Sequence, residues 1–179
     1  VEYFRGLLLT LKGTSSEAMS VSVKWDGAPA VFAGIDPSDG EFFVAKKGIF
    51  NKNPKVYKSH SDIDDDTSGD LSTKLKIAYT ELKKLNIKGV LQGDIMFTKS
   101  DLKKERIDGE SYITFHPNTI VYAVPFDQAD PLLQSKIGVV WHTKYEGSSF
   151  EDMSASFLID ISKLNKTKSV WMRTADLED

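Results

Sequence analysis

Residues 20–34 of the chain read SVSVKWDGAPAVFAG, and this stretch decides the fold class. Its first half alternates with the period of two expected of a strand that has one buried and one solvated face. The apolar positions are Val21, Val23 and Trp25. Gly27 and Pro29 end this strand, and residues 30–33 are predicted to return as the second arm of a hairpin. The early chain therefore reads as an antiparallel meander, with Lys24 and Asp26 on the solvated face.

Further strands are predicted downstream, around one clear helix. Leucines and an alanine recur at helical intervals through residues 70–86, between a polar start and Gly89. A second helix, or a helix broken near Ile159, is predicted within residues 151–165. The predicted strands are 41–45, 89–97, 119–126 and 136–145. Strands dominate over one or two helices, so the predicted class is α+β.

Composition limits the classes of protein to consider. The 179 residues are 40% hydrophobic and carry a net charge of -3, which suits one domain over residues 1–179 with no global basic field. There is no cysteine, and therefore no disulfide framework or sulfur-ligated zinc site. No apolar run is long enough to span a bilayer, so a cytoplasmic protein without a membrane partner is expected. The chain starts at Val1 and not at Met, so it is expected to be trimmed or part of something longer. A fragment that lacks a C-terminal domain is among the alternatives considered.

The sequence excludes two candidate metal sites. Residues 59–70 read SHSDIDDDTSGD, and the alternating aspartates resemble the start of a calcium loop. An EF-hand requires Gly at its sixth position and Glu at its twelfth, where this chain has Thr67 and Thr73. The segment is predicted to be a solvated loop. His60 and His116 lie in predicted loops and make no metal-binding set without cysteines.

Four motifs, in order, resemble those of the covalent nucleotidyltransferases, which include ATP-dependent DNA ligases, RNA ligases and mRNA capping enzymes. KWDG at residues 24–27 resembles their K-x-D-G nucleophile motif, and FVAKKGIF at 43–50 resembles the basic turn that follows it. LQGDIMF at 91–97 resembles their h-x-G-E-h motif, with Asp94 in the place of Glu. TIVYAVPFD at 119–127 resembles the strand that supplies an aromatic ring to the base, either Tyr122 or Phe126.

The later motifs match less well. The family's E/D-G-h-h-h-K motif is best matched by KIGVVWHTK, where Ile137 replaces the acid and His142 stands in the lysine position. Lys144, two residues on, would show the same face in a regular strand and is the alternative amine. The final lysine-bearing strand is faintly matched by residues 165–173, with Lys168 and Arg173 as candidates.

The resemblance implies a nucleotidyltransferase fold of two antiparallel sheets with flanking helices, and a site that uses ATP and Mg²⁺. Lys24 would be the nucleophile that forms a lysyl-AMP intermediate, and Asp94 would hold the metal. The nucleotide-binding candidates are Asp26, Gly27, Lys47, Phe126, His142 and Lys144. The implied acceptor is a 5′-phosphorylated RNA or DNA end. RNA is favoured because Pro29 replaces the arginine of the DNA-ligase form, and the small size is reminiscent of phage repair ligases acting in host cytoplasm.

The individual residues also have plainer interpretations. Trp25 is interpreted as core packing, His142 is either a core histidine or a phosphate contact, and Asp94 is either functional or a carboxylate that caps a turn. The alternative for the whole chain is a non-catalytic module of ligase fold that binds nucleotide or nucleic acid or serves as a structural domain. The missing acid before Gly138 is the feature that favours this alternative.

Overall fold

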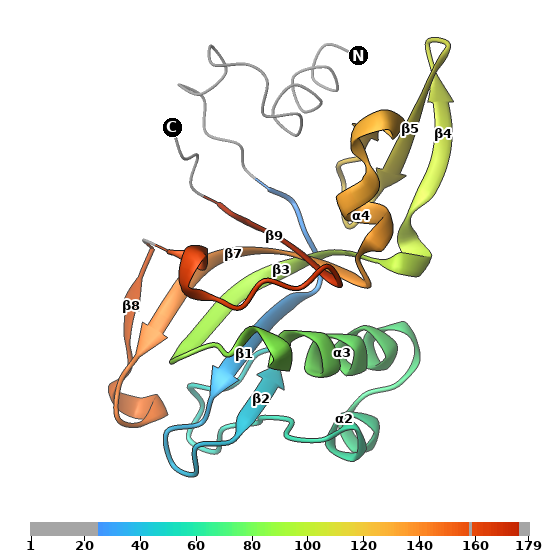
Figure 1. The fold of residues 1–179 in the computed structure, drawn as a ribbon. Coiled ribbons are helices and arrows are strands. Elements are labelled where there is room, and N and C mark those ends of the chain that lie inside the picture. The colour runs from blue at the N-terminus through green and yellow to red at the C-terminus, as the bar shows by residue number, and fades with distance from the viewer. Residues whose placement is uncertain (1–24, 158, 176–179) are drawn as a thin grey trace.

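The chain folds into two sheets and a few helices, which confirms the α+β class. The computed structural model describes residues 25–157 and 159–175 (Figure 1). Its strands are β1 (Ala30–Ile35), β2 (Phe42–Ala45), β3 (Val90–Thr98), β4 (Lys103–Ile107), β5 (Glu110–Phe115), β6 (Tyr122–Pro125), β7 (Ile137–Glu146), β8 (Ser154–Ser156) and β9 (Val170–Thr174). Its α-helices are α2 (His60–Asp66), α3 (Gly69–Leu82) and α4 (Asp130–Gln134).

The larger sheet has six strands in the order β2-β1-β3-β7-β8, with β9 paired to the same side of β7 as β8. All its pairs are antiparallel except β7 with β9, which run parallel. The smaller sheet has the order β4-β5-β6 and is antiparallel. The strands predicted at 41–45, 89–97, 119–126 and 136–145 are thus confirmed as β2, β3, β6 and β7, and residues 30–33 lie in β1.

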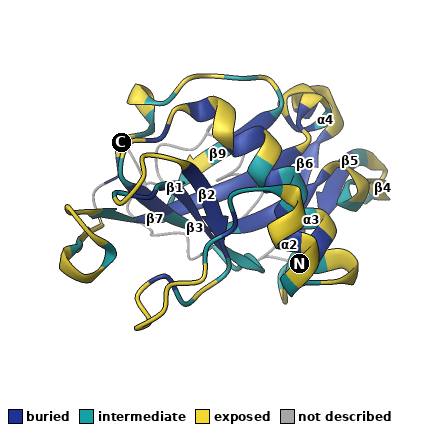
Figure 2. Ribbon diagram, turned by 90° about the horizontal axis from the view of Figure 1, so that it is seen from below, coloured by how far each residue is buried: buried dark blue, intermediate teal, exposed yellow. Residues whose placement is uncertain are grey.

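Helix α3 covers one face of the larger sheet, as the helical spacing of its leucines predicts (Figure 1). Leu75, Ala78 and Leu82 are fully buried against Val31, Leu91 and Trp141 of the sheet. Complete burial of each leucine contributes about 1.5–3 kcal/mol. The face under α3 is therefore the main core, which Figure 2 shows as buried strands behind half-exposed helices.

The opposite face of the larger sheet meets the smaller sheet at one end. Met96, Val140 and Trp171 from the larger sheet form a second core with Ile113 and Tyr122 from the smaller one. At the other end of this face, a third cluster surrounds Phe32, Phe43 and Ile49. Asp94 comes from β3 between these two apolar regions, so we call this side of the sheet the Asp94 face.

Two sequence expectations were wrong. Residues 59–70 contain α2 and not a solvated loop, because Ser59 caps the helix by accepting a hydrogen bond from the Asp62 backbone and Ile63 is fully buried. Residues 151–165 contain no α-helix among those described. They form two 3₁₀ turns, at Phe150–Asp152 and Ile161–Lys163, and strand β8, which pairs with the end of β7. No helix among the described residues is long and apolar enough to cross a membrane.

The β4–β5 hairpin projects from the body of the molecule (Figure 1). Its two-residue loop is Asp108-Gly109, and both residues have positive φ angles of 52° and 84°. That is the geometry of a type I′ turn, for which Asp-Gly is a preferred sequence. The pairing Ile107↔Glu110 closes the hairpin at this turn.

Candidate functional site

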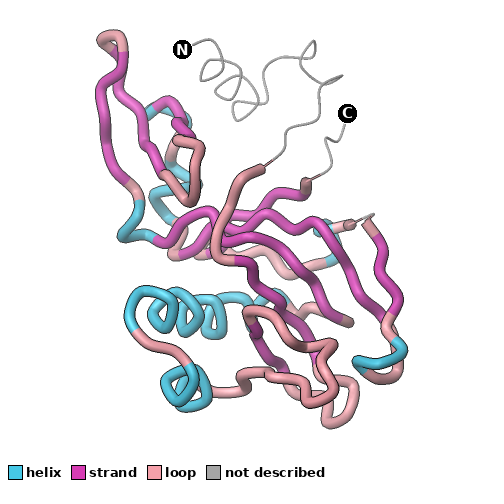
Figure 3. The backbone as a smooth tube through the Cα atoms, turned by 180° about the vertical axis from the view of Figure 1, so that it is seen from behind, coloured by secondary structure: helices cyan, strands magenta, loops and turns pink. Residues whose placement is uncertain are grey.

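The loop at residues 25–29 runs directly over β3 before it enters β1 (Figure 3). The Ala28 amide donates to the Ile95 carbonyl at 3.2 Å, and the Ile95 amide donates to the Pro29 carbonyl at 2.9 Å. A Cβ on Gly27 would lie 2.6 Å from both the Asp94 Cβ and the Met96 Sδ. Only glycine permits this approach, so Gly27 brings the loop against Asp94.

Asp26 ties the same loop to the smaller sheet. Its backbone amide donates to the Tyr122 hydroxyl at 2.7 Å. Its carboxylate accepts from the Asn118 side-chain amide at 2.8 Å and from the Thr119 backbone amide at 3.0 Å, and the Thr119 hydroxyl donates to it as well. Asp26 therefore joins the loop to residues 118–122, which links the two sheets beside Asp94.

Aromatic rings support this junction. Trp25 stacks on Tyr122 with ring centroids 5.4 Å apart, and Tyr122 stacks on Phe115 at 5.2 Å. Trp25 also meets the edge of Trp171 at 6.2 Å. Trp25 is therefore a packing residue next to the site, as its sequence position suggests. Of the two aromatic candidates, it is Tyr122 that reaches the loop.

Asp94 is partly buried, and within residues 25–157 and 159–175 its carboxylate has no hydrogen-bond or ion-pair partner. Burial raises the pKa of Asp94, the charge of His142 lowers it, and the charge of Asp26 raises it further, with a net upward shift. A carboxylate that loses water without gaining a donor is unfavourable unless something else compensates it. The position therefore suits a cation or a proton that comes from a ligand.

A β-bulge decides which residues of β7 accompany Asp94. Trp141 pairs with Gly93 and Thr143 pairs with Gln92, so His142 is the extra residue on β7. His142 is half-buried, near enough to Asp94 to influence its pKa, and its Nδ1 lies 2.7 Å from the Thr143 hydroxyl.

Lys144 does not join Asp94. It pairs with Leu91, which faces α3, and is therefore on the other side of the sheet from Asp94. Its amine forms an ion pair with Glu146 at 2.6 Å. The expectation that Lys144 supplies the amine in place of His142 rested on regular alternation, and the bulge breaks that alternation.

The remaining predicted residues occupy separate positions. Lys24, the proposed nucleophile, lies outside the described residues and is bonded to Trp25. Lys47 is exposed just beyond the end of β2 that lies toward Ala30, the β1 partner of Asp94. Phe126 is 40% exposed and contacts the Lys104 amine at 4.2 Å from its ring centroid. Among the described contacts it has none with Asp26, Gly27 or Asp94.

Sequence reasoning missed the partners that hold the loop in place. Asn118 lies just before the strand predicted at 119–126 and Thr119 is its first residue, and nothing in this local pattern indicates that they bind Asp26. Arg173 was considered only as a faint match to a final motif. Its β9 position pairs with Val140, which pairs in turn with Asp94, so the three positions form one row across the Asp94 face.

A cage of protein ligands for a metal is not found in the described part of the chain, where no group of three or more His, Asp or Glu side chains could hold an ion. Mg²⁺ is commonly held by one or two carboxylates together with substrate phosphates. Asp94, partly buried and without a donor among the described residues, fits that arrangement, whereas the carboxylate of Asp26 already accepts several hydrogen bonds.

Comparison with known proteins identifies one match. Residues 1–179 match the family described as Family of unknown function (DUF6267). No curated protein and no solved structure matches the chain. Because the match extends over the full length of the sequence, the chain belongs to the DUF6267 family.

Proposed function

We propose that this chain is a nucleotidyltransferase domain of the ATP-dependent polynucleotide ligase type. Lys24 would take AMP from ATP as a covalent lysyl-AMP, and the AMP would pass to a 5′-phosphorylated RNA or DNA end. Two sheets joined through the loop that follows Lys24 are compatible with a ligase fold, which is part of the proposal.

One observation carries the proposal: the loop directly after Lys24 is fixed against Asp94. Gly27 allows the close approach, and Asp26 and Tyr122 hold the loop from the other side. The three sequence motifs that contain Lys24, Asp94 and Tyr122 are separated by tens of residues. Convergence of their described residues on one junction is what a shared site requires.

The described residues have definite roles in this chemistry. A free lysine has a pKa of about 10.4, so the site must release its proton before the amine can attack. Nitrogen then bonds to the α-phosphorus of ATP as the bond to pyrophosphate breaks. Asp94 would hold Mg²⁺, which when bound offsets charge on the phosphate oxygens. His142 and Lys47 would contribute positive charge from either side of Asp94.

The non-catalytic alternative also has support in the structure. Ile137, in the place of the family's second acid, is fully buried, and Lys144 points away from Asp94. A domain that binds nucleotide without reacting would tolerate both changes.

The experiment is intact-protein mass spectrometry after incubation with Mg²⁺ and ATP, with a parallel GTP sample. We expect one AMP adduct on the wild type, none on Lys24→Ala, and an undiminished adduct on Lys144→Ala, the matched control on the other face. If folded protein freed of prebound nucleotide forms no adduct with either nucleotide, the enzymatic proposal fails and the binding module is preferred.

A further inference from the structure

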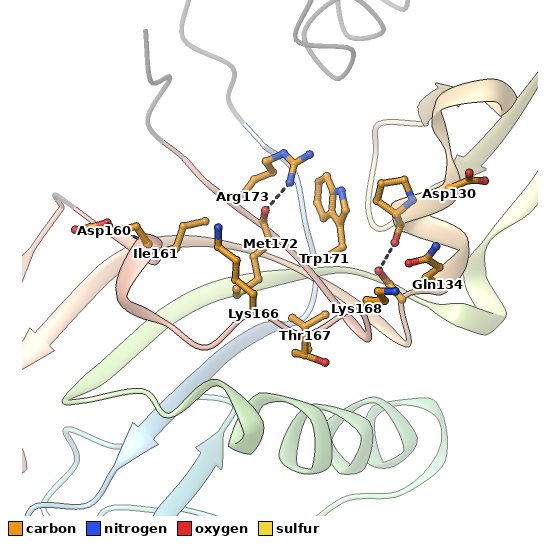
Figure 4. A pocket seen from close by; sticks show the side chains of 14 residues that line it. Asp130, Gln134, Asp160, Ile161, Lys166, Thr167, Lys168, Trp171, Met172 and Arg173 are labelled. Atoms are coloured by element: carbon orange, nitrogen blue, oxygen red, sulfur yellow. Dashed lines mark hydrogen bonds between the residues drawn. The ribbon is translucent and has the colours of Figure 1, made fainter.

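A groove of about 720 Å³ lies along β9, between that strand, α4 and the loop at residues 160–168 (Figure 4). Lys166 and Lys168 project from the loop, and Arg173 and Trp171 come from β9. Asp130 lies on the α4 side. The groove is thus formed by three segments that the sequence alone gives no reason to place together.

The groove carries excess positive charge in an acidic protein. Its lining has three cations, Lys166, Lys168 and Arg173, against two acids, although the whole chain has a net charge of -3. Lys166 and Lys168 are exposed, and neither forms an ion pair with any described residue. Asp130 and Asp160 also line the groove, but Asp160 already accepts from the Ser162 amide at 3.0 Å. Two cations are therefore available for an anionic ligand.

Arg173 is held in place at the edge of the groove. Its guanidinium lies over the Trp171 ring, 4.6 Å from the centroid, and donates to the Met172 carbonyl at 2.7 Å. A stacked guanidinium loses less conformational freedom when it binds phosphate than a free one does. The same hydrogen bond occupies a carbonyl of strand β9, which disfavours an added peptide strand along this edge.

One residue of the groove lies on the same face of the sheet as the candidate site. Arg173 pairs with Val140, and Val140 pairs with Asp94, so Arg173 stands two strands away from Asp94 on the same face. Two strand spacings amount to about 10 Å. A nucleic-acid backbone that lies along β9 would therefore need only a short further length to reach the candidate site.

We propose that the β9 groove binds the phosphodiester backbone of a single-stranded nucleic acid, with Lys166, Lys168 and Arg173 as its phosphate contacts. As the place where the acceptor strand lies, this assignment rests on the proposed function. The charge and geometry fit phosphates spaced along a strand, with no base-specific contact required.

The test is fluorescence anisotropy with a short, 5′-phosphorylated single-stranded RNA that is labelled at its 3′ end, measured over a range of salt. Lys166→Gln/Lys168→Gln is compared with Lys83→Gln/Lys88→Gln, an equal charge change at exposed lysines near the end of α3. We expect the groove variant to bind about tenfold more weakly and the slope of log K against log salt to fall by about 1.4, at about 0.7 for each lost contact. The control pair should leave both unchanged.

The outcomes separate the two proposals. If the groove variant binds RNA with wild-type affinity and slope, the groove assignment is overturned, whether or not the AMP adduct forms. Groove-dependent binding without any adduct supports the groove and removes the ligase chemistry. If a polyglutamate peptide binds as tightly as the RNA and loses as much affinity in the groove variant, the ligand is an acidic peptide and the nucleic-acid assignment fails.

Discussion

Replacement of Tyr122 by Phe tests whether the loop after Lys24 is held by the smaller sheet. The change removes a single oxygen, which accepts from the Asp26 amide at 2.7 Å. The ring stays, with its stacking on Trp25 and Phe115. Because Tyr122 is fully buried, water does not readily replace the lost acceptor.

An unsatisfied buried donor costs about 1–3 kcal/mol of unfolding free energy. For a chain of 179 residues, each kcal/mol lowers the melting temperature by about 2–4 °C, so we expect a fall of about 2–12 °C. Urea denaturation should show a lower midpoint with an unchanged slope, since the surface exposed on unfolding stays the same. Release of the loop should also slow AMP-adduct formation by about tenfold to a hundredfold, because a small displacement of reacting groups is costly.

Tyr79→Phe is the matched control. It removes a hydroxyl that donates to the Lys58 carbonyl at 2.6 Å, on the α3 side of the sheet. It should lose stability but retain the rate of adduct formation. Wild-type stability of Tyr122→Phe would refute the role of this hydrogen bond. If Tyr122→Phe loses stability but forms the adduct at the wild-type rate, the loop is not part of the catalytic site.

Three further changes have defined outcomes. Gly27→Ala places a Cβ 2.6 Å from Met96 Sδ, so we expect about 1–3 kcal/mol of destabilisation in urea and loss of the AMP adduct. If the variant has wild-type stability and forms the adduct, the close contact at Gly27 is refuted. Because the pKa of Asp94 is raised, its negative charge reduces the stability of the fold as pH rises above 3.8. Asp94→Asn should therefore have a higher melting temperature than the wild type at pH 7 and the same one at pH 3, and it should form no adduct. Equal melting temperatures of variant and wild type at both pH values would refute this effect of the charge. Burial raises the pKa of Asp36, but hydrogen bonds from Lys58 and Ser38 lower it by more, so the net shift is downward. The Asp36 carboxylate therefore stabilises the fold above pH 3.8, and this stabilisation is lost on acidification. Asp36→Asn should therefore lose about 1.5–3 kcal/mol at pH 7 and little in strong acid, and a pH-independent loss would exclude this cause.

Local patterns were sufficient for most elements of the fold. Apolar runs predict β2, β3, β6 and β7, most of whose residues are buried. The leucine spacing predicts α3, because that helix buries one face. The prediction of a loop at 59–70 was wrong because helix α2 has no apolar stripe. It depends on one buried residue, Ile63, and on the Ser59 cap. In the segment at 151–165, pairing of β8 with β7 overrides a helix-like pattern.

The sequence by itself determined the class of the fold and the order of the motifs around Lys24, Asp94 and Tyr122. Only the tertiary structure decided which residues meet. One extra residue at His142 turns Lys144 to the other side of the sheet, and strand pairing across β7 brings Arg173 into the row of Asp94. The reason is physical: side-chain direction within a strand is local, whereas register, bulges and strand order depend on hydrogen bonds between segments far apart in the chain.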